Sequence, residues 1–332
     1  MKRVVTGIQP SGTPHLGNYF GMIEPALELA REASATYFIA DYHALTTVRD
    51  PAVLRELTFE VTATWLALGL DPQRSTLYLQ SDLPEVCELS WLLGCVLAKG
   101  LLNRGHAYKS MVDDNRTAGR PVDAGVTAGV FDYPLLMAAD ILIHGAELVP
   151  VGDDNRQHVE ITRDVAAAFN AHYGPVFTLP EGRIEPSVAT VPGTDGRKMS
   201  KSYDNVVPIF ADRAELTRRI MSIVTDSRRP DEPKWPERCN VYALYRLVAP
   251  DDDAAELADR YRSGSVGYRE AKELLIEAHE RLFSDARARY DDLIDDRGHL
   301  RNVVADGAAR ARVTAREQLA RARDAVGLLG AT

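Results

Sequence analysis

The segment GIQPSGTPHLGNYFG, Gly7 to Gly21, joins the first strand-like run of this chain to its first helix-like run. The strand-like run is Lys2–Val5, and apolar residues at helical spacing occupy Tyr19–Ala30. Glycines let the backbone bend and approach a ligand, and the start of the following helix presents unpaired N–H groups and a positive dipole end. The segment therefore predicts a phosphate-binding loop. The alternative is a Gly/Pro turn that only connects two elements.

Two polar side chains in this loop supply further hydrogen-bond donors. His15 and Asn18 stand three residues apart. At the start of a helix this spacing puts both on one face. We therefore expect them to act together on a bound phosphate.

A second cationic segment, KMSKS at Lys198–Ser202, follows the flexible stretch Pro192–Gly196. Its two lysines alternate with serines, a pattern that suits the binding of triphosphate oxygens. The segment predicts a mobile clamp over a nucleotide, and a solvated basic loop is the alternative.

The first half of the chain alternates strand-like and helix-like segments. This alternation predicts a parallel sheet covered by helices on both faces. Strands are expected at Lys2–Val5, Thr36–Ala40, Ser75–Gln80 and Glu147–Val151, and helices at Tyr19–Ala30, Pro51–Leu70, Glu85–Ala98, Pro134–Ile143 and Gln157–Tyr173.

After about Pro208 the strand-like segments disappear and charged helical patterns replace them. We place a domain boundary there, with an α/β domain before it and an all-helical domain after it. The expected helices are Arg213–Ile223, Val241–Val248, Ala254–Arg262, Tyr268–Tyr290 and Val303–Leu328.

Composition excludes several classes of protein. The chain has 332 residues, 45% hydrophobic and 26% charged, as expected for a folded soluble protein. Its start reaches Gln9 and Pro10 before any long apolar run, unlike a signal peptide, and no stretch is apolar enough to span a bilayer. We therefore expect a cytoplasmic protein without a membrane partner.

The three cysteines, Cys87, Cys95 and Cys239, are widely spaced and form no CxxC pair. This pattern argues against a disulfide scaffold, a structural zinc ion and an iron–sulfur cluster.

The formal net charge of −9 does not indicate a nucleic-acid-binding protein, because phosphates are contacted by clustered lysine and arginine. Any RNA contact must therefore be local. Each local cluster is either a solvated helix face or a binding surface. The clusters are Arg218 with Arg219, Arg228 with Arg229, and the series Arg310, Arg312, Arg316, Arg321 and Arg323.

The two predicted phosphate loops together resemble the paired signatures of class I aminoacyl-tRNA synthetases, with HLGN in the place of HIGH. The longer string GxQPSGxxHLGNY resembles the bacterial tryptophanyl-tRNA synthetase family, and the likeness covers essentially the whole chain. Further motifs that carry it are DYHALT (Asp41–Thr46), YPLLMAADIL (Tyr133–Leu142), VPVGDDNRQHVEITRD (Val149–Asp164), KMSKS and, more weakly, VTDS (Val224–Ser227).

This resemblance implies a Rossmann-type catalytic domain over residues 1–207 and a smaller all-helical anticodon-binding domain over residues 208–332. The final helix can pack back on the catalytic domain. The family works as a homodimer. It uses ATP with Mg2+ to convert L-tryptophan to its adenylate, releases pyrophosphate, and transfers tryptophan to tRNA(Trp).

The resemblance also implies roles for individual residues. His15, Asn18, Lys198 and Lys201 are expected to stabilise the charge that develops as the tryptophan carboxylate attacks the α-phosphorus of ATP. The residues expected to bind ATP are Gln9, Pro10, Ser11, Gly17, Asn18, Lys109, Gly152, Asp153, Asp154, Val191, Lys198, Met199, Ser200, Lys201 and Ser202.

Asp140 matches the residue with which the family recognises the indole ring. An indole N–H only donates, so burying it requires an acceptor, and a carboxylate is a strong one. Without the family match, a helix carboxylate with an internal partner would be the expected role. The other residues expected to shape the tryptophan pocket are His43, Met137, Tyr133 and Gln9, with Gln157 a weaker candidate.

Two segments depart from the commonest family pattern. GDDN replaces GEDQ, which puts Asn155 where the family has a glutamine, and HAYK at His106–Lys109 also differs. Both changes resemble a divergent second branch of the family and concern the amino-acid contacts more than the reaction class.

Three alternatives remain open. A tyrosyl-tRNA synthetase shares the fold and both loops, although GIQPSG and MAAD favour tryptophan. A synthetase paralogue that binds RNA or protein without charging tRNA is disfavoured by the intact HLGN and KMSKS. Another HxGH-type nucleotidyltransferase fits the long helical C-terminal half poorly.

Overall fold

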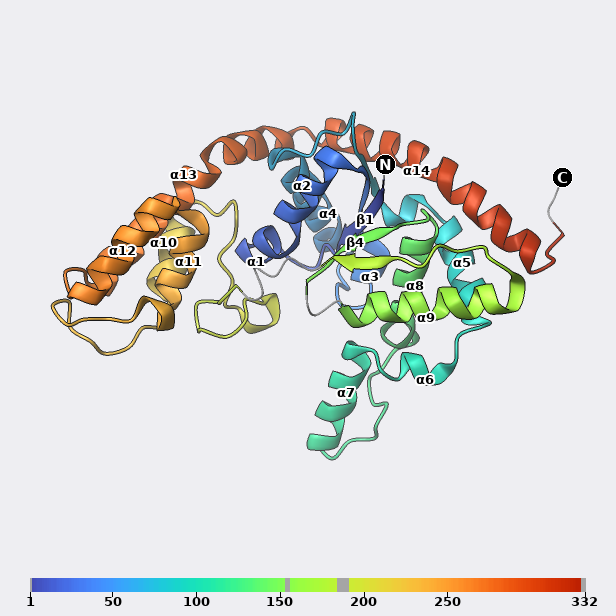
Figure 1. The fold of residues 1–332 in the computed structure, drawn as a ribbon, viewed down its shortest axis with the longest axis horizontal. Coiled ribbons are helices and arrows are strands. Elements are labelled where there is room, and N and C mark those ends of the chain that lie inside the picture. The colour runs from blue at the N-terminus through green and yellow to red at the C-terminus, as the bar shows by residue number, and fades with distance from the viewer. Residues whose placement is uncertain (1, 153–155, 184–190, 330–332) are drawn as a thin grey trace.

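Five parallel strands form the centre of the molecule, in the order β3-β2-β1-β4-β5 (Figure 1). The computed structural model describes residues 2–152, 156–183 and 191–329. The chain steps outward from β1 to β3 and then returns to the other side of β1, which is the Rossmann-type order. The predicted α/β class is confirmed. The strands are β1 (Arg3–Ile8), β2 (Ser34–Ile39), β3 (Thr76–Leu79), β4 (Leu148–Pro150) and β5 (Glu181–Arg183).

Helices cover both faces of this sheet. Successive residues of a strand point to opposite faces, so each strand contributes apolar side chains to a core on either side. Val4 and Tyr37 belong to one apolar core, while their neighbours Val5 and Phe38 belong to the other. None of the described helices is both long and apolar enough to cross a membrane. The α-helices are α1 (Leu16–Asn18), α2 (Glu24–Glu32), α3 (Asp41–Ala44), α4 (Pro51–Ala67), α5 (Glu85–Gly94), α6 (Lys99–Leu102), α7 (His106–Thr117), α8 (Ala128–Leu142), α9 (Arg156–Tyr173), α10 (Arg213–Met221), α11 (Asn240–Val248), α12 (Asp251–Ser263), α13 (Tyr268–Asp295) and α14 (Arg297–Ala325).

Several elements differ from the sequence predictions, among them the short helices α1, α3 and α6, which are not predicted, and α14, which begins at Arg297 and not at Val303. Helix α7 and strand β5 are not predicted: α7 is mostly polar, and β5 is three exposed residues. Helix α8 begins at Ala128, not at Pro134, because the Thr127 hydroxyl caps it by accepting a hydrogen bond from the Val130 N–H at 3.4 Å. Proline is favoured in a first helical turn, which explains the late predicted start.

From Arg213 onward the described chain contains helices and no strand. Helix α14 runs back along the molecule (Figure 1) and covers the edge strand β3. The two backbones approach so closely that a Cβ atom at Gly307 would lie 1.8 Å from the Leu77 carbonyl oxygen. Covering the edge in this way removes a row of unpaired backbone groups from solvent.

The C-terminal arginine series anchors α14 to the α/β part of the molecule. This corrects its interpretation as either a solvated face or an RNA-binding stripe, because four of its members contact groups before residue 90. The contacts are Arg310 with the carbonyl oxygens of Pro72 and Ser75, Arg312 with that of Asp82, Arg316 with the Glu85 carboxylate, and Arg323 with the Glu88 carboxylate.

Candidate active site

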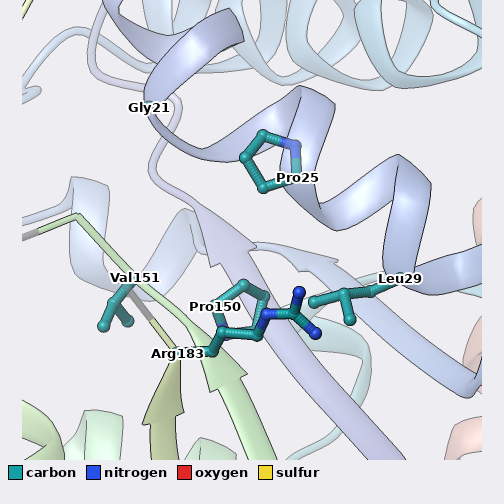
Figure 2. A pocket seen from close by; sticks show the side chains of 6 residues that line it. All are labelled: Gly21, Pro25, Leu29, Pro150, Val151 and Arg183. Atoms are coloured by element: carbon teal, nitrogen blue, oxygen red, sulfur yellow. The ribbon is translucent and has the colours of Figure 1, made fainter. Parts of the chain in front are cut away.

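The strand order reverses between β1 and β4, and the carboxyl ends of these two strands therefore open a crevice where ligands bind in such sheets. A small hollow of about 10 Å³ adjoins this point (Figure 2). Gly152 is the second residue after β4, while the predicted ATP-binding residues Asp153 and Asp154, and Asn155, lie outside the described residues. The hollow is lined by Gly21, Pro25, Leu29, Pro150, Val151 and Arg183.

The structure brings the two predicted phosphate loops into contact. The Lys201 ammonium donates a hydrogen bond to the Gly12 carbonyl at 2.5 Å. The Gly17 N–H lies 3.3 Å from the Met199 sulfur. Gly12 and Lys201 are 189 positions apart in the chain, yet their two loops form one surface beside the end of β1.

His15 is buried at the start of α1. Its backbone N–H donates to the Asn18 side-chain oxygen at 3.2 Å, which fixes both residues in one turn. Burial, and then the nearby Lys201 ammonium, lower the pKa of His15 to about 3. The imidazole is therefore neutral at physiological pH and acts through hydrogen bonds. Its buried Nδ1 has no hydrogen-bond partner in the structure.

Lys201 is largely withdrawn from solvent, and this burial lowers its pKa to about 8, opposed by the Glu60 carboxylate. Glu60 is held near the loop by a hydrogen bond from the Thr13 hydroxyl at 3.1 Å. An approaching triphosphate would favour the charged amine, because an opposite charge raises a lysine pKa. A pKa of about 8 leaves most of this amine charged at neutral pH, and a bound triphosphate would keep it charged at higher pH.

The remaining KMSKS residues are held by hydrogen bonds within the loop and to residues around it. Met199 is buried, and its N–H donates to the Val191 carbonyl at 2.9 Å. The Ser200 hydroxyl accepts a hydrogen bond from the Ser202 N–H at 3.3 Å, while the Lys198 side chain is exposed.

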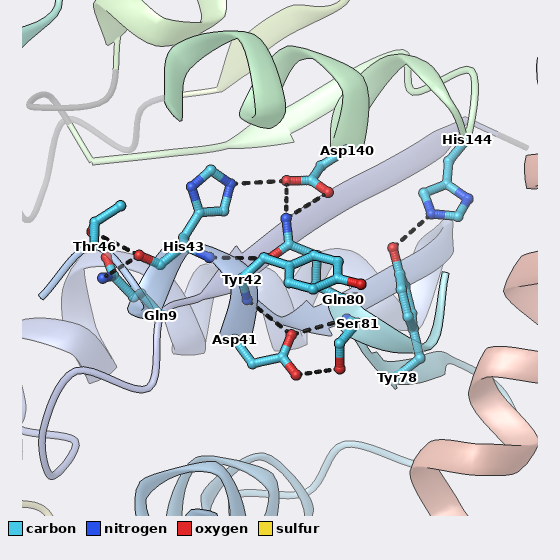
Figure 3. A network of polar contacts seen from close by, with 10 residues as sticks. All are labelled: Gln9, Asp41, Tyr42, His43, Thr46, Tyr78, Gln80, Ser81, Asp140 and His144. Carbon is cyan, nitrogen blue, oxygen red and sulfur yellow. Dashed lines mark hydrogen bonds and ion pairs between the residues drawn. The ribbon is translucent and has the colours of Figure 1, made fainter. Parts of the chain in front are cut away.

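A buried polar network lies beyond the carboxyl ends of β1 and β3 (Figure 3). The Asp140 carboxylate is fully buried on α8. His43 Nε2 lies 3.0 Å from Asp140 Oδ2. The Gln80 amide donates to Oδ1 at 2.9 Å and to Oδ2 at 2.8 Å. The structure therefore joins the predicted residues Asp140 and His43 and adds Gln80.

This network leaves Asp140 able to accept one more donor. A carboxylate offers about four acceptor positions, and three contacts are made here. Burial raises the pKa of Asp140, opposed by the contact with His43. An oriented, buried carboxylate with spare acceptor capacity suits recognition of a single N–H group.

Two other predicted pocket residues, Gln9 and Tyr133, contact His43. The Gln9 amide donates to the His43 carbonyl at 3.2 Å. The Tyr133 ring lies edge-on to the His43 ring with centroids 6.3 Å apart, and Met137 is half-buried on the same helix as Asp140. Gln157, on α9, has a buried side-chain oxygen without a hydrogen-bond partner among the described residues.

Lys109 is not joined to the phosphate loops in this structure. It is exposed on α7, which packs against α8 and projects from the body of the molecule (Figure 1). Its predicted contact with ATP stays a prediction.

Sequence reasoning missed two residues of the site, Gln80 and Asn205. Gln80 directly follows β3, and polar residues at the carboxyl ends of parallel strands are a usable signal for a site. Asn205 follows KMSKS by three residues and lies buried beneath it. No local pattern marks Asn205, since its partners are set by the folding of the loop.

Comparisons with known proteins agree on one family. Residues 1–284 match the model of class I tRNA synthetases for tryptophan and tyrosine. A tryptophan–tRNA ligase of Pseudomonas aeruginosa is 49% identical over 98% of this chain and 74% of its own length, and one of Xylella fastidiosa is 50% identical over 98% and 76%. The crystal structure of a Campylobacter jejuni tryptophanyl-tRNA synthetase complexed with ADP and tryptophan superposes with a TM-score of 0.88 at 42% identity, covering 98% of this chain and all of that one.

Proposed function

Because the chain belongs to the class I tRNA synthetases for tryptophan and tyrosine, we propose that it is a bacterial-type tryptophan–tRNA ligase. It activates L-tryptophan with ATP, releases pyrophosphate and transfers tryptophan to tRNA(Trp). The observation that carries the choice of substrate is the buried Asp140 carboxylate, which has acceptor capacity for one more donor.

The chemistry needs no protein nucleophile, since the tryptophan carboxylate attacks the α-phosphorus in line and expels pyrophosphate. Catalysis then rests on positioning and on stabilising the developing charge. We assign this stabilisation to His15, Asn18, Lys198 and Lys201. The contact between the two loops supports the assignment, because it puts the donors of both on one surface. Mg2+ is proposed to arrive with the phosphate oxygens of ATP, as it commonly does in such sites.

Aminoacylation tests this function directly. The purified protein should charge total tRNA with tryptophan and should catalyse pyrophosphate exchange that depends on tryptophan. Exchange supported by tyrosine in place of tryptophan would favour the tyrosyl alternative. Exchange without charging would indicate a paralogue that has lost tRNA transfer.

The helical part after residue 207 is proposed to bind the anticodon of tRNA. Most of its clustered arginines are engaged within the chain: Arg218 and Arg219 pair with Glu215. The surface around Trp235 combines arginines with an exposed aromatic ring, and Arg228 there also donates to the Pro233 carbonyl and pairs with Asp226. The indole is 52% exposed, the Arg228 guanidinium lies 3.4 Å from its ring centre, and Arg238 lies 5.6 Å away.

A hollow of about 370 Å³ opens beside this tryptophan. The loop before it is rigid, because the buried Lys234 ammonium donates to three backbone carbonyl groups. Exposed aromatic rings with arginine neighbours bind unpaired bases by stacking. The hollow is lined by Val224, Thr225, Asp226, Trp235, Arg238, Cys239, Asn240 and Tyr268.

Trp235→Ala should raise the KM for tRNA about 5- to 30-fold, which corresponds to the loss of one stacked base at about 1–2 kcal/mol. Trp235→Phe should keep most of the affinity, because it keeps an aromatic face. Tryptophan-dependent pyrophosphate exchange measured without tRNA serves as the control and should not change. Equal tRNA affinity in parent and Ala variant would remove this surface from the RNA interface.

The homodimer implied by the family is also proposed here, on a face of α5. Cys87, Trp91 and Cys95 are spaced by four residues and form one exposed apolar stripe, with Trp91 74% exposed. Exposed apolar patches of this kind commonly mark protein interfaces. Two exposed free thiols also agree with the proposed cytoplasmic location, where thiols stay reduced.

Trp91→Glu should convert the dimer to monomers, because it would place two carboxylates in an apolar interface. Light scattering coupled to gel filtration should give twice the 36.6 kDa chain mass for the parent and about one chain mass for the variant. An exposed glutamate elsewhere, as in Val313→Glu on α14, is the matched control. A parent that is monomeric at micromolar concentration contradicts the proposal.

A further inference from the structure

The side chain of Asn205 lies under the KMSKS loop and is 1% exposed. Its Oδ1 accepts a hydrogen bond from the Ser200 N–H at 2.8 Å. Its Nδ2 donates to the Lys198 carbonyl at 3.1 Å and to Asp195 Oδ1 at 2.7 Å. One amide thus holds the backbone on both sides of Met199 and ties it to the segment that leads into the loop.

The segment that leads into the loop, Pro192–Gly196, also packs against Asn205. The Asn205 carbonyl accepts a hydrogen bond from the Thr194 N–H at 2.9 Å. A Cβ atom at Gly193 would lie 2.2 Å from Asn205 Nδ2, so this close approach requires glycine. The PGTDG stretch, which the sequence predicts to be flexible, therefore packs tightly around the Asn205 side chain.

The hydrogen bond between the Ser200 N–H and Asn205 also affects the position of Lys201. The short helical turn Lys201–Tyr203 starts at Ser200, whose N–H is the group that Asn205 holds. From this turn the Lys201 ammonium reaches the Gly12 carbonyl in the opposite loop. We infer that Asn205 is a positioning residue for adenylate formation, which sets the KMSKS backbone so that Lys201 meets the phosphates. The inference rests on the proposed function.

Only an amide side chain can make all three hydrogen bonds at position 205, because one acceptor and two donors are needed there. Aspartate has the same shape and keeps the acceptor for Ser200. Its second oxygen, however, would face the Asp195 carboxylate and the Lys198 carbonyl, and neither can donate. Asn205→Asp therefore changes the hydrogen bonding with little change in packing.

A double-mutant cycle tests the inference. Asn205→Asp should lower kcat for tryptophan-dependent pyrophosphate exchange about 20-fold, with the KM for tryptophan unchanged because the tryptophan pocket lies elsewhere. Asp195→Asn alone should cost a few fold at most, because its remaining oxygen can still accept from Asn205 and only the exposed ion pair with Arg197 is lost. The double variant should recover part of the lost rate, because the amide introduced at position 195 can donate to the carboxylate introduced at position 205, while the Lys198 carbonyl still faces that carboxylate. Asn103→Asp, which changes an exposed residue directly after α6, is the control for the added charge.

Two results would overturn the inference. One is a double variant no faster than Asn205→Asp. The other is a loss of kcat that is accompanied by a raised KM for tryptophan and a matching fall in Tm, as expected of a residue that only supports the fold.

Hydrogen exchange supplies a readout that does not depend on activity. In Asn205→Ala the Ser200 amide should exchange about 10-fold faster, the effect of one lost hydrogen bond, while amides of β1 and β2 keep the parent rate. If the Ser200 amide of this variant exchanges at the parent rate, Asn205 does not hold that amide and the inference is contradicted. Failure of the parent to activate tryptophan, with Ser200 exchange accelerated in this variant, would instead refute the proposed function.

Discussion

Lys201→Ala is expected to slow tryptophan-dependent pyrophosphate exchange by about 2–4 kcal/mol, or roughly 30- to 900-fold. The ammonium lies between the two phosphate loops and is largely removed from water, where a charge interacts more strongly with phosphate oxygens than it does in solvent. Both kcat and kcat/KM should fall together, since the contact stabilises the transition state. Lys99→Ala, which removes an exposed lysine on α6, is the matched control.

The pH dependence makes this test specific for Lys201. Its pKa of about 8 means that the free enzyme loses the ammonium as the pH rises through 8. The parent should therefore lose kcat/KM for ATP above that pH, whereas Lys201→Arg keeps its charge and should not show this loss. Lys198→Ala should give a loss of similar size, and Lys109→Ala tests whether the lysine of α7 takes part. Activation at the parent rate in both KMSKS lysine variants would show that the loop assignment is wrong.

Asp140→Ala is expected to reduce tryptophan activation by about 2–4 kcal/mol, because the buried indole N–H would lose its acceptor. Asp140→Asn keeps one acceptor oxygen but loses the charge, so its activity should lie between those of the parent and the Ala variant. The structure adds a second cost for the Ala variant, since His43 and Gln80 also lose their acceptor.

A substrate analogue separates recognition from this structural cost. In the analogue, sulfur replaces the indole nitrogen and no donor remains. The parent should prefer tryptophan strongly, whereas Asp140→Ala should largely lose the preference. The preference is a ratio measured on one protein, so partial unfolding of the variant cancels. If the parent and Asp140→Ala show the same preference, a residue other than Asp140 recognises the indole nitrogen.

Several features of this enzyme follow from local sequence. The junction at Gly7–Gly21 predicts a loop between strand and helix, and the structure has β1 before it and α1 and α2 within and after it. Periodicity also predicts α4, α9 and the C-terminal helices closely, because helix and strand patterns depend on neighbours a few residues apart. The role of Asp140 rests instead on the resemblance of YPLLMAADIL to the family, because the residues by themselves favour a helix carboxylate with an internal partner.

Tertiary structure alone decided which distant residues meet. Gln80 reaches Asp140 across 60 residues, and Lys201 reaches Gly12 across 189. The C-terminal arginines, which in sequence resemble a nucleic-acid-binding stripe, anchor α14 beside β3. Asn205 has no distinguishing pattern, and its role comes from the fold of the loop above it. A local pattern records only which surface of an element is apolar or charged, whereas the partner of a polar group is set by the packing of whole elements.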